Sequence, residues 1–211
     1  MAYIRWTFRI FILIWLGGCL HYTLPQQDIV RIVDTFEERQ DFGGWTDMFW
    51  QNTGDATADN PVTRDVLFIQ SVTPDEKPSV YRNQDTGWGW PPYFKFDTAN
   101  LQTKAADALS TSDTPEWVAI RHYGWRITWL GDGIFPNALS MKPVEGPDVR
   151  LIPWFNIVFL TLLLVALLSI WRLWRNFRVH RIDPVFAEID QTTDAAKGRV
   201  AGWFGRLFGR K

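Results

Sequence analysis

The sequence predicts a mainly β exported domain carried by two transmembrane α-helices. Two apolar stretches, residues 10–24 and 151–171, bracket a polar segment of residues 25–150. Within that segment, short runs of β-branched and aromatic residues alternate with turn residues, as in a chain of strands. The charge is divided in the same way, because residues 25–150 hold 11 basic and 19 acidic side chains while both flanks are basic.

The second apolar stretch, residues 151–171, is the stronger membrane signal. Its 21 residues carry no charge, and as a helix they would span about 31 Å, close to the hydrocarbon thickness of a bilayer. Trp154 stands near one end and Trp171 near the other, where aromatic rings favour the membrane interface. Basic residues follow, so we expect residues 172–211 to form a basic cytoplasmic tail.

The first stretch is shorter and allows three interpretations. Residues 1–9 contain Arg5 and Arg9 without an acid, and residues 10–24 then read as a transmembrane signal-anchor that ends at Pro25. Alternatively, Leu16-Gly-Gly-Cys19 resembles a bacterial lipobox, which would make the chain a lipoprotein anchored through Cys19. The third interpretation is a cleaved signal peptide.

Lys and Arg accumulate on the cytoplasmic flanks of membrane spans. We therefore expect a bacterial inner-membrane protein with both termini in the cytoplasm and residues 25–150 in the periplasm. The acidic balance of this domain excludes nucleic acid as a partner, because nucleic acid requires a basic face.

The polar segment contains predicted strands at residues 28–36, 63–70, 79–82, 114–120 and 138–142. A polar extension, residues 37–41, follows the first strand, and the fourth continues towards Leu130. A helix over residues 100–109 with Asp97 or Thr98 as its cap falls between the third and fourth strands. Three strands, a helix and two strands match the order of an oligonucleotide/oligosaccharide-binding-like (OB-like) small Greek-key barrel. Residues 43–61 form an insert whose aromatic side chains either tuck beneath it or form an adhesive patch.

The most unusual stretch is Asn83–Asp97, in which glycines and a Pro-Pro pair bend a chain rich in aromatic residues. Arginine beside aromatic rings is favoured in protein interfaces and serves sugar or peptide grooves equally well. In the other interpretation, the tryptophans plug the barrel and Arg82 pairs internally with Asp85. The candidate interface comprises Arg82, Asp85, Trp88, Trp90, Tyr93, Trp125 and Arg126.

Residues for catalysis or metal binding are scarce. His122 is the only histidine of residues 25–150, and Cys19 is the only cysteine of the chain. We expect His122 to be a packing residue, no metal site, no cofactor and no catalytic residue. The paired acids Asp55 and Asp59 lack the spacing of a calcium loop.

The end of the chain, residues 195–211, predicts an amphipathic helix on an anionic membrane surface. Its apolar and basic residues recur at helical spacing, and four glycines weaken it in water. The residues expected to touch the membrane are Trp203, Phe204, Leu207, Phe208, Arg206 and Arg210.

Three motifs resemble the bacterial Domain of Unknown Function 1523 family. They are residues 20–25 (Leu-His-Tyr-Thr-Leu-Pro), residues 81–96 and residues 123–127 (Tyr-Gly-Trp-Arg-Ile), with Phe135-Pro-Asn137 following. The resemblance spans roughly residues 10 to 145 and leaves the second apolar stretch and the tail outside. It implies an N-terminally anchored, exported single domain, and it carries over no catalytic residue.

Together these features predict a non-enzymatic accessory or interaction subunit of a bacterial inner-membrane protein complex. Its partners would be the lipid bilayer and other integral membrane proteins. The alternative is a periplasmic envelope hydrolase or a sugar- or peptide-binding module that uses Asp85 with Trp88 and Trp90.

Overall fold

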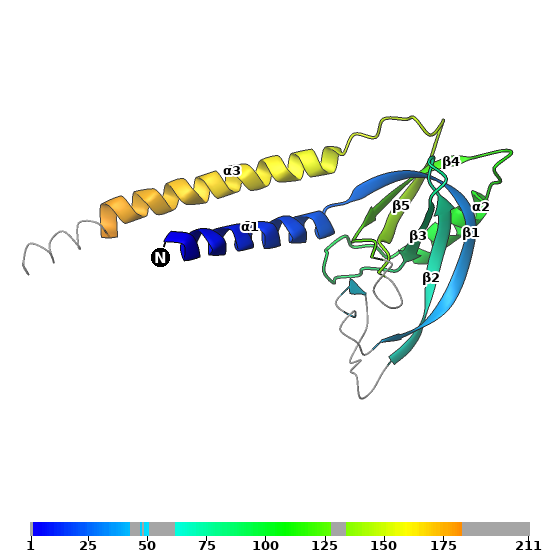
Figure 1. Cartoon of the computed structure of the whole chain (residues 1–211), viewed down its shortest axis with the longest axis horizontal. Coiled ribbons are helices and arrows are strands. Elements are labelled where there is room, and N and C mark those ends of the chain that lie inside the picture. The colour runs from blue at the N-terminus through cyan, green and yellow to red at the C-terminus, as the bar shows by residue number, and fades with distance from the viewer. Residues whose placement is uncertain (1, 43–46, 48, 51–61, 128–133, 183–211) are drawn as a thin grey trace, which may run out of the picture. The chain divides into compact units, whose positions relative to one another are not determined.

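The computed structural model describes residues 2–42, 47, 49–50, 62–127 and 134–182. The chain divides into two compact units, Met1–Asn156 and Ile157–Lys211. The first unit contains a long helix, a ring of five strands and a short helix (Figure 1). The second contains most of another long helix and a π-helical turn, Arg178–Ile182. The predicted amphipathic helix, residues 195–211, and its membrane-surface residues lie outside the described residues.

Two long apolar helices are present as predicted, with different limits. α1 comprises Ala2–Thr23 and α3 comprises Trp154–Phe177. The predicted span starts at residue 10, whereas α1 starts at Ala2, because the helix continues through the basic segment that contains Arg5 and Arg9. α3 begins after Pro153, which leaves residues 151–153 outside it, and continues past residue 171. Both helices are long and apolar enough to cross a membrane, and their apolar side chains are exposed rather than buried in a protein core.

The five strands are β1 (Gln26–Phe42), β2 (Val62–Val72), β3 (Pro78–Asn83), β4 (Trp117–Tyr123) and β5 (Asn137–Val144). They close into a ring in the order β1-β2-β3-β5-β4. All neighbours are antiparallel except β3 and β5, which are parallel through Arg82 and Asn137. Every strand expected from the sequence is present, and the polar extension of the first belongs to β1. The fourth begins at Trp117 rather than at residue 114 and ends at Tyr123, so its predicted continuation stops there; residues 128–130 lie outside the described residues.

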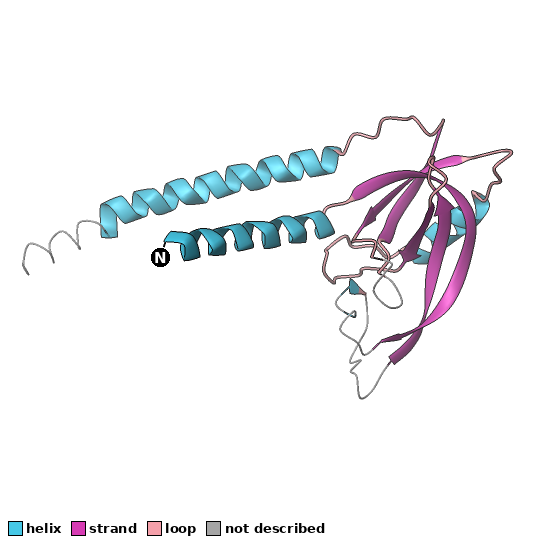
Figure 2. Ribbon diagram, viewed as in Figure 1, coloured by secondary structure: helices cyan, strands magenta, loops and turns pink. Residues whose placement is uncertain are grey.

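β1 closes the ring because it is long enough to pair with two neighbours. Its first half, Gln26–Arg31, pairs with β4, and its second half pairs with β2 up to Phe42. A register shift between Ile32 and Asp34 lies within the pairing with β2, just after β1 leaves β4 at Arg31. Such a bulge bends a strand and increases its twist. In Figure 2, β1 is the strand that continues from α1 and curves around the sheet.

The short helix α2 (Thr98–Asp107) covers one core of the ring. Its Leu101 and Ala105 pack with buried strand residues such as Val30, Ile69 and Tyr81. The predicted cap is corrected: Asp97 is the N-cap residue but makes no side-chain hydrogen bond there. Instead, the Asp85 carboxylate accepts hydrogen bonds from the Thr98 amide at 3.0 Å and hydroxyl at 2.7 Å. The cap comes from a distant loop because the chain folds back over the helix N-terminus.

A second core gathers aromatic side chains at the far end of β1 and β2. Phe42, Trp50, Val66 and Phe68 are buried together, and Phe49 packs against them. Trp50 and Phe49 belong to the insert of residues 43–61, and both rings pack into this core rather than forming an exposed patch, as one of the two interpretations expected. Trp45 and Met48 of the same insert lie outside the described residues.

Candidate functional site: an aromatic loop and a cationic pocket

The loop between β3 and α2 exposes four aromatic rings. Trp88 is 84% exposed and Trp90 is 72% exposed, and Phe94 and Phe96 are more than half exposed. Trp88 packs edge-on against Phe94 and Phe96, with ring centroids 5.2 and 6.2 Å apart. Of the two interpretations, the one in which the tryptophans plug the barrel is therefore wrong. We call these four rings the aromatic patch.

A buried polar frame holds this loop in place. Lys95, between Phe94 and Phe96 in sequence, is buried, and its ammonium donates to the carbonyls of Gln84 at 3.3 Å and Ala138 at 2.8 Å, and to the side chain of Asn83. Thr86, also buried, accepts from the Lys95 amide, and the Gly87 amide donates to the Lys95 carbonyl. Gly87 takes a positive φ of 53°, which favours glycine. Burial lowers the pKa of Lys95 to about 8, although Asp85 and Asp97 oppose the shift.

The opposite side of the loop contacts the last turn of α1. The Tyr93 hydroxyl donates to the Thr23 carbonyl, and its ring stacks on Tyr123 with centroids 5.1 Å apart. The Gly124 amide donates to the Tyr22 carbonyl at 2.9 Å. Gly124 has a φ of 98°, and a side chain there would meet Tyr22 and the backbone of Pro136.

This junction brings together the three motifs on which the family resemblance depends. Residues 20–25 supply the helix end, residues 81–96 supply Tyr93, and residues 123–127 supply Tyr123, Gly124 and Trp125. Trp125 completes the contact, because its indole donates to His21 Nδ1 at 3.1 Å and its ring packs edge-on against Tyr22. The motifs therefore join α1 to the ring, and the aromatic patch is connected to the helix end through Tyr93.

The predicted interface residues do not form one surface. Trp88 and Trp90 are exposed together, Tyr93 and Trp125 serve the junction, and Asp85 holds the start of α2. Arg82, an interface residue in one interpretation and internally paired in the other, is only 1% exposed and lies over the Trp50 ring at 5.1 Å. Tyr81 and Asn83 on either side of it are buried as well, so alternation along β3 does not explain its burial; Trp50 of the insert lies over it, a long-range contact that the sequence did not indicate.

Arg126 belongs to a separate cluster around Asp28. The Asp28 carboxylate accepts from the Tyr81 hydroxyl at 2.6 Å, faces His122 Nε2 at 3.0 Å and forms an ion pair with Arg126 at 3.9 Å. His122 is buried, as expected of a packing residue. Burial alone would raise the pKa of Asp28, but the His122 and Tyr81 hydrogen bonds and the Arg126 charge lower it to about 2.

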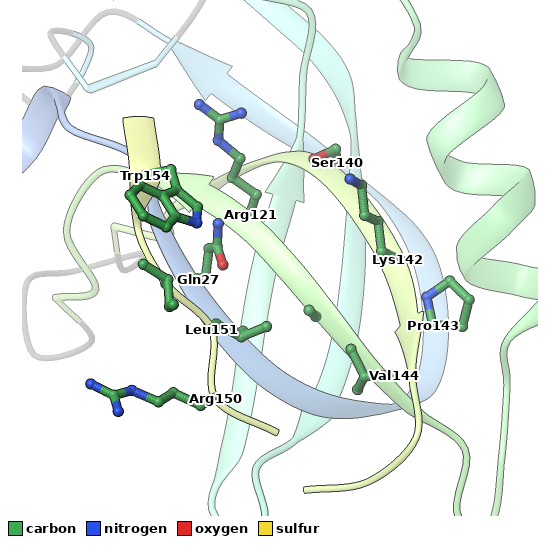
Figure 3. Close-up of a pocket in the computed structure, with 11 residues that line it drawn as sticks. Gln27, Arg121, Ser140, Lys142, Pro143, Val144, Arg150, Leu151 and Trp154 are labelled. Atoms are coloured by element: carbon green, nitrogen blue, oxygen red, sulfur yellow. The ribbon is translucent and has the colours of Figure 1, made fainter. Parts of the chain in front are cut away.

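A pocket missed by the sequence reasoning lies on the outer face of the ring (Figure 3). It has a volume of about 460 Å³ and lies between strands β1, β4 and β5 and residues 150–154. Its polar lining includes Arg121, Ser140, Lys142 and Arg150, and Trp154 and Leu151 contribute apolar surface. Among the described residues, no carboxylate lines it. We call it the cationic pocket. The sequence offered no sign of it because these residues are scattered over three strands and the segment before α3.

Metal ligands are not gathered anywhere in the described part of the chain: no group of three or more His, Cys, Asp or Glu side chains is suitably placed. Cys19 is exposed on α1.

Comparison with known proteins matches residues 1–178 to a family model described as "Protein of unknown function (DUF1523)". An uncharacterized protein from Haemophilus influenzae is 38% identical over 144 residues, which cover 67% of this chain and 76% of that protein. No solved structure matches the chain. The family match extends over the second apolar helix, which the three motifs alone had left outside the resemblance.

Proposed function

The chain belongs to the DUF1523 family, whose function is unknown, and we propose that it is a non-enzymatic interaction subunit of a bacterial inner-membrane protein complex. In this proposal α1 and α3 cross the membrane, both termini are cytoplasmic and residues 25–150 are periplasmic. Support comes from the exposed apolar surface of both helices and from the basic flanks around an acidic domain.

We further propose that the ring is an OB-like small Greek-key barrel. The order β1-β2-β3-β5-β4, the parallel pairing of β3 with β5, and the position of α2 between β3 and β4 support this assignment. The fold leaves the ligand open, because OB-like barrels serve unrelated functions and the acidic balance of this domain disfavours nucleic acid.

The observation that carries the proposed function is the aromatic patch. Four large rings on one exposed loop exceed what isolated surface hydrophobic residues account for. A frame of buried hydrogen bonds around Lys95 orders the loop before any partner binds, which lowers the entropic cost of association. Exposed tryptophans are frequent hot spots of protein interfaces.

A protein partner accounts for the patch better than anionic lipid does. The only cation between Asn83 and Asp97 is Lys95, and it is buried. Asp97 is exposed at the end of the same loop. Surfaces that bind anionic membranes combine apolar side chains with exposed Lys or Arg. The patch lies beside the end of α1 through Tyr93 and Thr23, so the partner we propose is an integral membrane protein with an apolar or basic periplasmic surface.

The non-enzymatic assignment is supported by the environment of the groups that could perform acid–base chemistry. His122 is buried, and its partner Asp28 is already bonded to Tyr81 and Arg126. Asp85, which the hydrolase alternative would use, is bonded to Thr98 at the start of α2. These carboxylates perform structural tasks at the positions where they lie.

Co-purification of the full-length chain in mild detergent tests the proposal. We expect a membrane protein to accompany the wild type in stoichiometric amount, and Trp88→Ser with Trp90→Ser to remove it at unchanged melting temperature. A loss of at least about 2 kcal/mol per hot-spot tryptophan corresponds to roughly 30-fold weaker binding for each. Val33→Ser is the control, because Val33 is an exposed apolar residue of β1 outside the patch.

The outcome that contradicts the proposal is also specific. If the double variant retains the partner, the patch is not the interface. If the wild type purifies without protein partners but with bound glycan, the sugar-binding alternative replaces the proposed function.

A further inference from the structure

We propose that the cationic pocket binds a phosphate group, and that this group is supplied by the headgroup of an anionic phospholipid. The inference concerns a different surface from the aromatic patch. It rests on the membrane anchoring proposed above but not on the protein partner.

The strand register explains how the pocket is built. Gln27 of β1, Arg121 of β4 and Ser140 of β5 are neighbours across the sheet. Ile120 and His122 on either side of Arg121 are buried, and side chains alternate along a strand, so Arg121 faces outward. Lys142 follows Ser140 by two residues and therefore lies on the same face. Figure 3 shows Arg121, Ser140 and Lys142 on the strands near one another, while the Arg150 side chain extends away from them.

The charge of the pocket is opposite to that of its surroundings. Residues 25–150 hold 19 acidic against 11 basic side chains, yet three of those basic residues line this pocket and no described carboxylate does. Within the part of the chain that the structure describes, Arg121, Lys142 and Arg150 form no ion pair, whereas Arg39, Lys77 and Arg126 each have a carboxylate within 4.0 Å. Arg121 lies over the Phe155 ring at 5.1 Å. This aromatic contact does not neutralise the charge of the guanidinium.

These groups suit a phosphate. A guanidinium presents planar donors that match phosphate oxygens in pairs, and an ammonium adds a compact charge. Ser140 adds a hydroxyl that can donate to a third oxygen. The volume of about 460 Å³ falls within the range of small-ligand sites. Leu151 and Ile152 give the pocket an apolar side that would receive the glycerol and first acyl carbons of a lipid.

The position of the pocket favours a lipid over free phosphate. Trp154, which lines it, is the first residue of α3, and Gln27 follows the last residue of α1 by four positions. The Asn156 side chain donates to the Pro25 carbonyl at 2.9 Å, which ties the start of α3 to the exit of α1. If both helices cross the bilayer, this edge of the ring lies at the level of the headgroups, where tryptophan is favoured.

Native mass spectrometry of the full-length protein in dodecyl maltoside tests the inference. The protein is titrated with phosphatidylglycerol and, separately, with phosphatidylcholine, and the bound lipid is counted. Each basic residue near anionic lipid contributes about fivefold in affinity. We therefore expect preferential binding of phosphatidylglycerol, weakened about 30-fold by Arg121→Gln with Lys142→Gln.

The matched control is Arg39→Gln with Arg64→Gln, which removes the same charge from the far half of β1 and its partner β2. We expect this variant to bind phosphatidylglycerol as the wild type does. Equal binding by both double variants would show that the pocket is not the site.

A third arm separates the two sources of phosphate. Inorganic phosphate is titrated at constant ionic strength against the lipid-bound protein. Weak displacement supports a lipid site, whereas displacement as effective as that by phosphatidylglycerol overturns the lipid assignment. Recovery of the protein in the membrane fraction before extraction tests the anchoring itself, so a failure of anchoring is distinguishable from a failure of the pocket.

Discussion

Lys95 provides a prediction in which a buried charge controls the stability of the aromatic loop. Lys95 is 5% exposed and its ammonium has carbonyl and amide partners, and burial lowers its pKa from 10.5 to about 8. Because the folded protein binds this proton less tightly than the unfolded chain, the penalty is fully present below pH 8. It is relieved as the pH rises from about 8 to 10.5, and stability increases across this window.

The magnitude follows from the shift. One pKa unit corresponds to 1.36 kcal/mol, so a shift from 10.5 to about 8 corresponds to roughly 3 kcal/mol at most. That is a substantial part of the 5–15 kcal/mol by which small domains are stable. Lys95→Met removes the titration and takes a donor away from the Ala138 carbonyl and the Asn83 side chain, whereas the Gln84 carbonyl keeps its bond from Asn137. We therefore expect this variant to be less stable than the wild type, by a margin that widens above pH 8.

The measurement is urea unfolding of full-length protein in detergent at pH values between 7 and 10.5. The free energies of unfolding of the wild type and of Lys95→Met are subtracted at each pH, because the titration of tyrosines and exposed lysines contributes equally to both and cancels. Lys77→Met is the control, since Lys77 is exposed in the turn between β2 and β3. If the difference in the free energy of unfolding between the wild type and Lys95→Met stays constant from pH 8 to 10.5, Lys95 does not titrate with a lowered pKa in the folded protein.

Three further predictions concern acid stability, topology and the tail. Asp28→Asn should lower the free energy of unfolding by about 1 kcal/mol above pH 3.8, a value already reduced because Asp28 is partly exposed to solvent. In acid titrations of stability, the difference from the wild type should vanish as the pH falls through about 2. Alkaline phosphatase fused after Asp113 should be active and after Lys211 inactive; the opposite pattern would reverse the proposed orientation. A peptide of residues 192–211 should gain helicity on anionic vesicles and keep part of its binding at high salt, whereas Trp203→Glu with Phe204→Glu should lose that part. Undiminished high-salt binding by the double variant would exclude an apolar contribution.

The local structure was largely predictable because it depends on neighbouring residues. The β-branched runs marked the strands, and the position of α2 between the third and fourth strands was correct. The capping of α2 was not, because the residue that holds its N-terminus, Asp85, lies 13 positions before Thr98. Similarly, Trp88 and Trp90 had two open interpretations, since glycine and proline bend a segment without indicating which side faces the core.

The sequence by itself determined the two apolar helices, the separation of an acidic domain from basic flanks, and the order of five strands and one short helix. These features depend on composition and periodicity over a few turns or a single strand. Only the tertiary structure decided which side chains meet. Asp28 reaches His122, and Gln27, Arg121 and Ser140 share one face, because the register of β1, β4 and β5 joins residues about a hundred positions apart. Register depends on the whole ring closing at once, so no local stretch of the chain contains it.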